Sequence, residues 1–160
     1  NNEPGKAIEW LERALKIHQE LSDKKGEANQ LSNLAMAYRK KGKGGGAIKL
    51  LKQSLQIQKE IGYKLGEAGV LGNIGILYMD KGDHKNAFKY LEEALKTQES
   101  IGDKHGQAVQ NSIIGFLYQK TGDNEKGLKY MKQAKRLFEE LGAKKDVQDI
   151  EKLITSFEKH

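Results

Sequence analysis

Apolar residues recur along this chain with the spacing of α-helices, and polar residues fill most of the positions between them. Between residues 24 and 41, Leu31, Leu34, Ala35 and Tyr38 fall on one arc of a helical wheel. The same stretch lacks the strict alternation that a half-buried β-strand would show. The pattern therefore predicts a helix with one side facing a core.

The whole pattern repeats with a fixed period and without a gap. The segment "LSDKKGEA" begins at residue 21 and has counterparts that begin at residues 61, 101 and 141. Each unit contains two helical patterns of about 16 to 18 residues that are separated by a glycine turn, as in a helical repeat. The first helices are expected to run from about Lys24, Lys64 and Lys104 to the glycines at 42, 82 and 122, and the second helices to end near Ile61, Ile101 and Leu141.

These units predict one all-α domain of about eight helices. We divide it into an unpaired second helix at 1–22, repeats at 23–62, 63–102 and 103–142, and a capping helix at 143–160. The capping helix has one apolar face and charged remaining faces, as the end of a stack requires. That face consists of Val147, Ile150, Leu153, Ile154 and Phe157.

The glycine-rich stretch 41–49, "KGKGGGAIK", contains G-x-G-x-x-A, which is one form of the loop that holds a dinucleotide pyrophosphate. The same turn in the other repeats carries Asp83 and Asp123, each able to cap the following helix. Lys43 takes that place here, and a helical pattern precedes the turn where a nucleotide loop needs a strand. We therefore predict a helix start without a cap, prone to fraying, and no nucleotide site.

The columns of the repeat also carry a family pattern. L-x-x-L/I-A/G-x-x-Y is met by Leu31, Leu34, Ala35 and Tyr38, by Leu71, Ile74, Gly75 and Tyr78, and with one departure by Asn111, Ile114, Gly115 and Tyr118. The later columns hold Ala47, Leu51 and Ser54, then Ala87, Leu91 and Ala94, then Gly127, Met131 and Ala134. In these columns the chain resembles tetratricopeptide repeats, in the 40-residue form of kinesin light chain and of many bacterial regulatory proteins. Asn111, Gly127 and the absence of a proline at the end of each unit depart from that pattern.

The resemblance implies an α-solenoid, a right-handed superhelix of stacked antiparallel hairpins whose first helices line a concave, peptide-binding surface. On the helical wheel, the arc opposite the core-facing arc would form this surface. The expected peptide-binding residues are Asn29, Ser32, Asn33, Met36, Arg39, Lys40, Gly69, Gly72, Asn73, Ile76, Met79, Val109, Ser112, Phe116, Gln119 and Lys120.

Three features of this arc suggest what it binds. Met36, Ile76 and Phe116 form an apolar column, which either lines a groove or fills the seam between adjacent hairpins. Asn33 and Asn73 share a column from which an amide can pair with a peptide backbone, although a solvated surface asparagine is equally compatible. The small residues Ser32, Gly69, Gly72 and Ser112 lie beside these columns and leave room for a ligand.

The expected ligand is an apolar or amphipathic segment of a protein partner, bound as an extended strand or a short helix. Arg39, Lys40 and Lys120 would favour acidic flanks. The resemblance also suggests the carboxylate clamp of chaperone-binding relatives, but most of the required columns hold other residues, such as Met36 and Val109. We therefore expect no clamp.

Self-association is the alternative function. The unpaired first helix would expose Ile8, Trp10 or Leu11 on the side where a companion helix belongs. Such an end would favour a homo-oligomer, because exposed apolar surface usually marks a site of contact.

Composition narrows the classes of fold and function that remain possible. The 160 residues are 37% hydrophobic and 31% charged, which suits an elongated fold with much surface. The chain contains no cysteine, so disulfides and thiolate sites are excluded. The net charge of +6 permits an acidic partner, and Lys24, Lys64, Lys104 and Lys144 recur along one edge. Glu27 and Glu67 partly offset the positive charge of these lysines, and few exposed aromatic side chains are available to stack on bases. We therefore expect no nucleic-acid binding.

Catalytic chemistry finds no support in the sequence. His18, His84, His105 and His160 show no metal-ligand spacing, and no serine lies in a nucleophile motif. We therefore expect a non-catalytic scaffold without metal or cofactor. No apolar stretch is long enough to cross a membrane, and we expect a cytoplasmic protein.

Overall fold

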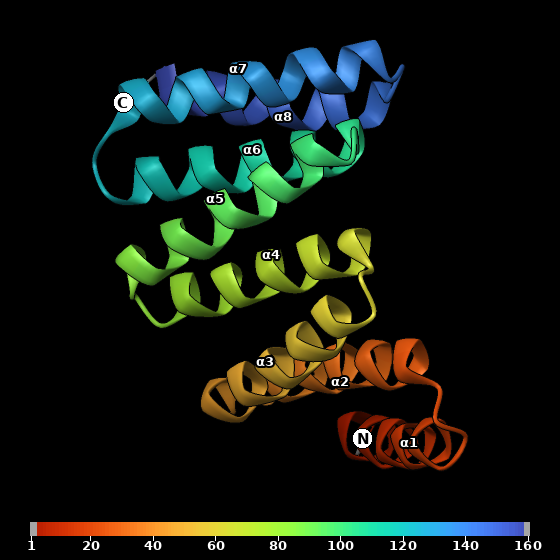
Figure 1. Cartoon of the computed structure of the whole chain (residues 1–160). Helices are drawn as coiled ribbons and strands as arrows, with labels where there is room; N and C mark the ends of the chain where they lie inside the picture. The colour runs from red at the N-terminus through yellow and green to blue at the C-terminus, as the bar shows by residue number, and fades with distance from the viewer. Residues whose placement is uncertain (1–2, 159–160) are drawn as a thin grey trace.

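A computed structural model describes residues 3–158, with side chains from residue 6 onward, so His160 lies outside the described residues. These residues form eight α-helices stacked in chain order, with α1 at one end and α7 and α8 at the other (Figure 1). The helices are α1 Glu3–Glu20, α2 Lys24–Lys40, α3 Gly44–Glu60, α4 Lys64–Asp80, α5 His84–Ser100, α6 Lys104–Lys120, α7 Asn124–Glu140 and α8 Lys144–Glu158. The predicted all-α solenoid and the predicted helix ranges are confirmed.

Each helix from α1 to α7 ends in a turn that reverses the chain. The turns contain glycines with φ between 67° and 87°, and Ser22 takes the corresponding place after α1 with φ 56°. Glycine adopts this left-handed conformation without a steric penalty, so a helix can stop and the next one can start within three residues. The fixed turn length keeps the hairpins in the same register throughout the chain.

Aspartates cap the start of four of the eight helices. Asp23, Asp83, Asp103 and Asp123 each accept the backbone N–H of the residue three positions later. The Gly26 N–H, followed by the ring of His18, holds the pKa of Asp23 below its usual value. Lys43 makes no such bond at the start of α3, as predicted from the glycine-rich turn.

We predict that Lys43→Asp will raise the free energy of unfolding by about 0.5–2 kcal/mol, because the new carboxylate can accept the free N–H of Gly46. Thermal unfolding measured by circular dichroism, together with hydrogen exchange at residues 44–47, would test this. Lys43→Ala is the matched control, since it removes the lysine without supplying an acceptor. Equal stability of the two variants would contradict the prediction.

The core runs through the stack as a series of linked clusters. Leu71, Ile74, Leu77 and Leu91 are fully buried between hairpins, and Ile114 and Leu117 continue this core towards α7. Aromatic pairs reinforce the hairpins: the ring centroids of Tyr78 and Tyr90 lie 5.5 Å apart, and those of Tyr118 and Tyr130 lie 5.4 Å apart. Each hairpin is therefore held mainly by its immediate neighbours, as in other linear repeats.

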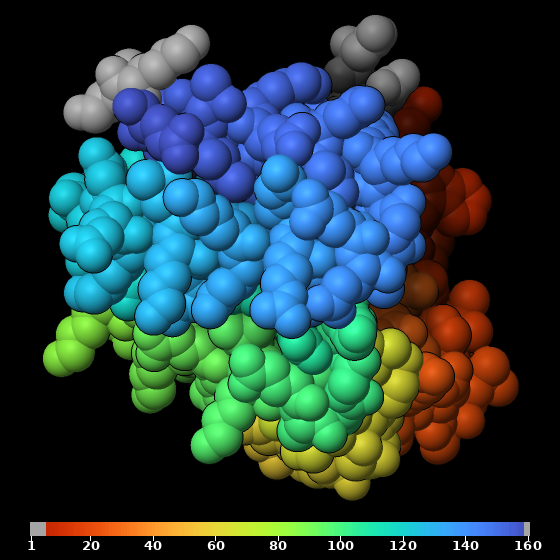
Figure 2. All heavy atoms as spheres, turned by 90° about the horizontal axis from the view of Figure 1, so that it is seen from above, coloured from red at the N-terminus to blue at the C-terminus, as the bar shows by residue number. Residues whose placement is uncertain are grey.

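The helices form two rows. We call α2, α4, α6 and α8 the inner helices and α1, α3, α5 and α7 the outer helices, because α2 contacts α4 and α4 contacts α6, whereas the outer helices pack chiefly on inner ones. Seen from above, α7 and α8 cover one end, and α1 and α2 are displaced to one side (Figure 2). Closer spacing of the inner helices places the concave side along them.

The capping helix α8 departs from its predicted face at one position. Ile150 and Phe157 are buried against α7, and Val147 and Ile154 pack beside them. Leu153 is exposed. Its register within the repeat explains the difference, because it follows Asn33, Asn73 and Ile113 at intervals of one repeat and therefore faces the concave side.

Candidate peptide-binding groove

Four positions of each inner helix form the concave side. On α2 they are Asn29, Asn33, Met36 and Lys40, which recur at helical spacing on the side away from the core. We call this surface, with its equivalents on α4, α6 and α8, the groove. The equivalents are Gly69, Asn73, Ile76 and Asp80, then Val109, Ile113, Phe116 and Lys120, then Asp149, Leu153 and Ser156, while the fourth position of the last set falls on His160, outside the described residues.

Most predicted groove residues do reach solvent. Asn29, Asn33, Gly69 and Lys120 are exposed, and Lys40 is exposed at the edge. Asn73, Ile76 and Gln119 are half-buried. The groove is therefore partly open along all three repeats.

The apolar column contributes both to the groove and to the seam. Met36 packs against the core cluster of the first two hairpins, and Phe116 packs against the cluster shared by α6, α7 and α8. Met79 likewise contacts the cluster around Leu91 and Ile114. All three side chains are half-buried, so part of each fills a seam and part borders the groove.

The small residues of the arc differ in how much space they leave for a ligand. The Ser32 hydroxyl is 2.9 Å from that of Ser54 on α3, and the Ser112 hydroxyl donates to the carbonyl of Ala108. Gly72 is buried, and a side chain there would come within 3.0 Å of Oε1 of Gln110. The expectation that Gly72 borders open space is wrong, because Gln110 of α6 fills that space, whereas Ser32 and Ser112 are half-buried.

Charged groove residues are partly neutralised within the chain. Arg39 on α2 forms an ion pair with Asp80 on α4 at 2.6 Å, so its positive charge is already balanced within the chain. Asn29 accepts a long hydrogen bond of 3.5 Å from Gln58. Lys120 lies 5.4 Å from the centroid of the Phe116 ring. Lys40 and Lys120 therefore remain the positive groups able to attract an acidic flank.

Three groove residues are not among the expected peptide-binding residues. Ile113 and Leu153 extend the column of Asn33 and Asn73 with apolar side chains, and Asp80 supplies the partner of Arg39. The 40-residue register could have identified Leu153, had α8 been aligned with the other inner helices. Val109 and Leu153 are 38% and 39% exposed, whereas the apolar side chains of the α2–α4 half, Met36 and Ile76, are half-buried.

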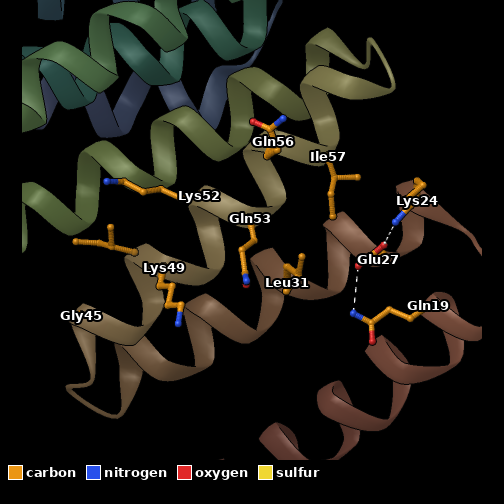
Figure 3. Close-up of a pocket in the computed structure, with 11 residues that line it drawn as sticks. Gln19, Lys24, Glu27, Leu31, Gly45, Lys49, Lys52, Gln53, Gln56 and Ile57 are labelled. Atoms are coloured by element: carbon orange, nitrogen blue, oxygen red, sulfur yellow. Dashed lines mark hydrogen bonds and ion pairs between the residues drawn. The ribbon is translucent and has the colours of Figure 1, made fainter.

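A separate hollow of about 690 Å³ lies between α1 and α3, on the side of α2 opposite the groove (Figure 3). Leu31, Ile48 and Ile57 form its apolar floor. At its edge, Glu27 accepts hydrogen bonds from Lys24 at 2.9 Å and from Gln19 at 3.1 Å. The hydrogen bond from Lys24 holds the pKa of Glu27 below its usual value.

This hollow is a product of the stacking and recurs along the chain. A similar space of about 480 Å³ lies between α5 and α7 and includes Asn111 and Tyr130. Between α3 and α5, Lys59 spans the corresponding gap to reach Glu93 at 3.5 Å. Because successive outer helices diverge, these spaces follow from the fold itself.

The residues predicted for self-association do not share one environment. Ile8 is buried towards α2 and Leu11 is half-buried, so the expectation that Ile8 is exposed is wrong. Trp10 is exposed. Ile8 corresponds to Ile48, and this column packs on the inner helix of the next hairpin.

Two further findings concern the described residues only. Among residues 6–158, whose side chains the structure describes, no three histidine, aspartate or glutamate side chains are grouped so that they could hold a metal ion. In the same range no helix combines the length and the apolar character that a bilayer crossing requires.

Comparison with solved structures identifies proteins that share this fold. BtubC (BKLC) from P. vanneervenii is 21% identical over 98% of this chain and 72% of its own length, with a TM-score of 0.76. Aspartyl phosphate phosphatase F from Bacillus subtilis is 17% identical over 94% of this chain and 39% of its own length, with a TM-score of 0.86. A kinesin light chain-like protein from Podosopora anserina with nearly identical TPR-like repeats is 17% identical, over 99% of this chain and 88% of its own length, with a TM-score of 0.70. At these identities the likeness shows the fold alone.

Comparison of the sequence with family models identifies the family. No curated protein matches the chain. A family model described as tetratricopeptide repeat matches residues 3–60, and a second model with the same description matches residues 68–101 and 112–140. Since these ranges cover most of the chain, it belongs to the tetratricopeptide repeat family.

Proposed function

We propose that the chain is a non-catalytic scaffold whose groove binds a segment of a partner protein. Membership of the tetratricopeptide repeat family supports a role in protein–protein interaction. The observation that carries the groove assignment is the exposure of apolar side chains within it, at Val109 and Leu153, beside half-buried Ile76 and Phe116. Exposed apolar surface of this kind favours a docking site.

The two halves of the groove favour different parts of a ligand. Asn33 and Asn73 offer amide donors and acceptors to a peptide backbone in the α2–α4 half. Val109, Ile113 and Leu153 would bury apolar side chains of the ligand in the α6–α8 half. Lys40 and Lys120 lie at the edge and favour carboxylates that flank the bound segment. The proposed ligand is therefore an amphipathic segment that is apolar at one end, and its backbone is either extended or helical.

A random peptide library displayed on phage would test this assignment, because it offers the groove every class of short sequence. We expect enriched sequences to contain two or more large apolar residues near acidic ones. The double variant Val109→Asp and Leu153→Asp should weaken binding of the enriched peptides by at least about tenfold, because each change puts a charge where an apolar side chain must dock.

Both substituted residues are exposed, so the double variant should keep its fold. Leu141→Asp is the matched control, because Leu141 is an exposed leucine at the end of the outer helix α7 and therefore lies outside the groove. Circular dichroism would verify that both variants remain helical. Unchanged affinity of every enriched peptide for the double variant would refute the groove assignment.

Assembly through α1 is the second candidate function. One observation favours it: the face of α1 that carries Trp10 is apolar and exposed, whereas the remainder of the stack covers the matching faces of the other outer helices.

A further inference from the structure

Exposed large apolar side chains occur once on each of three successive inner helices. Leu65 on α4, Val109 on α6 and Leu153 on α8 are 49%, 38% and 39% exposed. Each follows the previous one by one repeat and four further residues, which is one further helical turn. The three side chains therefore lie on a line that crosses the concave side obliquely, and we call this line the apolar diagonal.

The exposure of the apolar diagonal is a property of the stack. Leu65 and Val109 lie on helices with neighbours on both sides, since α4 packs between α3 and α5 and α6 packs between α5 and α7. Leu153 lies in the row of Asn73 and Ile113, which solvent also reaches in part although helices flank them. No helix within residues 3–158 covers these side chains, so a ligand can occupy the line.

The spacing along the apolar diagonal selects the conformation of the ligand. Figure 1 shows α4, α6 and α8 running in the same direction. Packed helices lie about 8–10 Å apart and four residues advance about 6 Å along a helix, so neighbouring members of the diagonal are about 10–12 Å apart. Seven residues of an α-helix span about 10.5 Å, whereas four residues of a strand span about 13 Å and three of polyproline II about 9 Å. An α-helix with an apolar residue at every seventh position therefore fits best.

The carboxylates of the groove are already paired within the chain. Asp80 lies 2.6 Å from the guanidinium of Arg39. Asp149 lies 3.2 Å from the ammonium of Lys152. The groove therefore has no unpaired carboxylate among the described residues that would repel an acidic ligand.

Lysines border the groove without partners of this kind. Lys40 and Lys120 lie at one edge, and Lys25 and Lys145 lie at the other, one helical turn before the first groove positions of α2 and α8. All four are exposed, and none forms an ion pair within residues 6–158. The ammonium of Lys25 lies 4.3 Å from the centroid of the Tyr63 ring, at the start of α4 where Leu65 lies. Acidic residues beside the apolar ones of the ligand would complement this charge.

We propose that the groove binds an acidic amphipathic α-helix of a partner protein along the apolar diagonal. Successive apolar residues of that helix, seven positions apart, contact Leu65, Val109 and Leu153, and its carboxylates face the lysines at the edges. This proposal rests on the groove function proposed above and specifies the ligand of the groove as a helix.

A synthetic peptide of about 18 residues, with three leucines at seven-residue intervals, glutamates beside them and alanine elsewhere, is a direct probe. Fluorescence polarisation of the labelled peptide would give its dissociation constant. Leu65→Glu should raise this constant by at least about tenfold, because a carboxylate would lie where a leucine must dock. Leu141→Glu, at an exposed leucine at the end of α7, should leave it unchanged.

A proline in the middle of the peptide tests the conformation. It interrupts the helix and leaves every leucine and glutamate in place. We expect at least about a tenfold loss of affinity, and the same loss when proline is placed centrally in the peptides selected by phage display. Equal affinity of the proline peptides would show an extended ligand and would overturn the proposal.

Charge reversal tests the alignment on the apolar diagonal. Lys25→Glu should weaken binding of the acidic peptide by about threefold to tenfold, whereas Lys129→Glu, on the exposed side of α7, should not. Lysines in place of the glutamates beside one terminal leucine should restore affinity for Lys25→Glu, and the same exchange at the other end should not. Rescue from both ends or from neither would contradict the alignment.

The remaining outcomes separate the helix from the groove function. Selected peptides that bind the Val109→Asp and Leu153→Asp double variant poorly, tolerate the central proline and bind Leu65→Glu normally would refute the helix and support the groove. If no peptide of either kind binds the groove, both proposals fail. A dimer of this chain that Leu65→Glu dissociates would assign the apolar diagonal to a second copy and exclude the acidic partner.

Discussion

Leu91→Ala is expected to lower the free energy of unfolding by about 2–5 kcal/mol. Leu91 is fully buried between hairpins and belongs to the cluster formed with Ala87, Ile114 and Leu117. Its side chain also fills the space beside Gly75, where an added side chain would come within 2.6 Å of it. The truncation would leave a cavity that the surrounding backbone cannot close.

The position of Leu91 in the middle of the stack gives this loss a recognisable pattern. Because each hairpin is held mainly by its neighbours, we expect Leu91→Ala to increase the rate of hydrogen exchange more in α4, α5 and α6 than in α1 or α8. Chemical denaturation would supply the change in free energy. Leu65→Ala, at an exposed leucine, should change it by less than about 0.5 kcal/mol. A uniform increase in exchange along the whole chain would contradict the linear coupling of the hairpins.

Gly115→Ala should destabilise the protein by about 1–3 kcal/mol, whereas the same change at Gly69 should stabilise it by up to about 1 kcal/mol. An alanine side chain at Gly115 would lie 2.9 Å from the carbonyl oxygen of Gly127 and 3.0 Å from Cγ of Met131. The carbonyl belongs to the backbone of α7, so α6 and α7 would have to move apart. At Gly69 nothing lies within 4 Å of the added side chain.

The pair of glycine variants separates packing from helix propensity, because alanine improves the propensity of both helices equally. Thermal unfolding of the two variants and the parent chain is sufficient as a measurement. If both substitutions stabilised the protein, the close approach of α6 and α7 would not matter for stability. Gly69→Ala should also leave peptide binding in the α6–α8 half of the groove unaffected, since it lies in the other half.

The sequence predicted the helices and their order because those depend on local signals. Glycines at the turns, aspartate caps and helical periodicity recur every repeat, so each boundary is indicated several times. The missing cap at Lys43 was predicted from the same comparison. Agreement between repeats, rather than any one residue, made these predictions accurate.

The groove was harder to predict because a helical wheel assigns only two sides to a helix that has several neighbours. Ser32 faces α3 and Gly72 faces Gln110 of α6, although both lie on the arc away from the main core. Leu153 was assigned to the core for being apolar, although its register points to the groove. Ile8 and Trp10 were grouped together, whereas helical spacing separates them onto two faces.

The difference between α1 and α8 also determines how this protein could be lengthened by engineering. A further inner helix with the face of α4 could be fused ahead of α1 without altering any existing residue, since the exposed face of α1 that carries Trp10 and Ile17 would accept it. At the other end, Gln148, Glu151, Thr155 and Glu158 would first need small and apolar replacements. Tandem arrays built from this chain should therefore be extended from the α1 end.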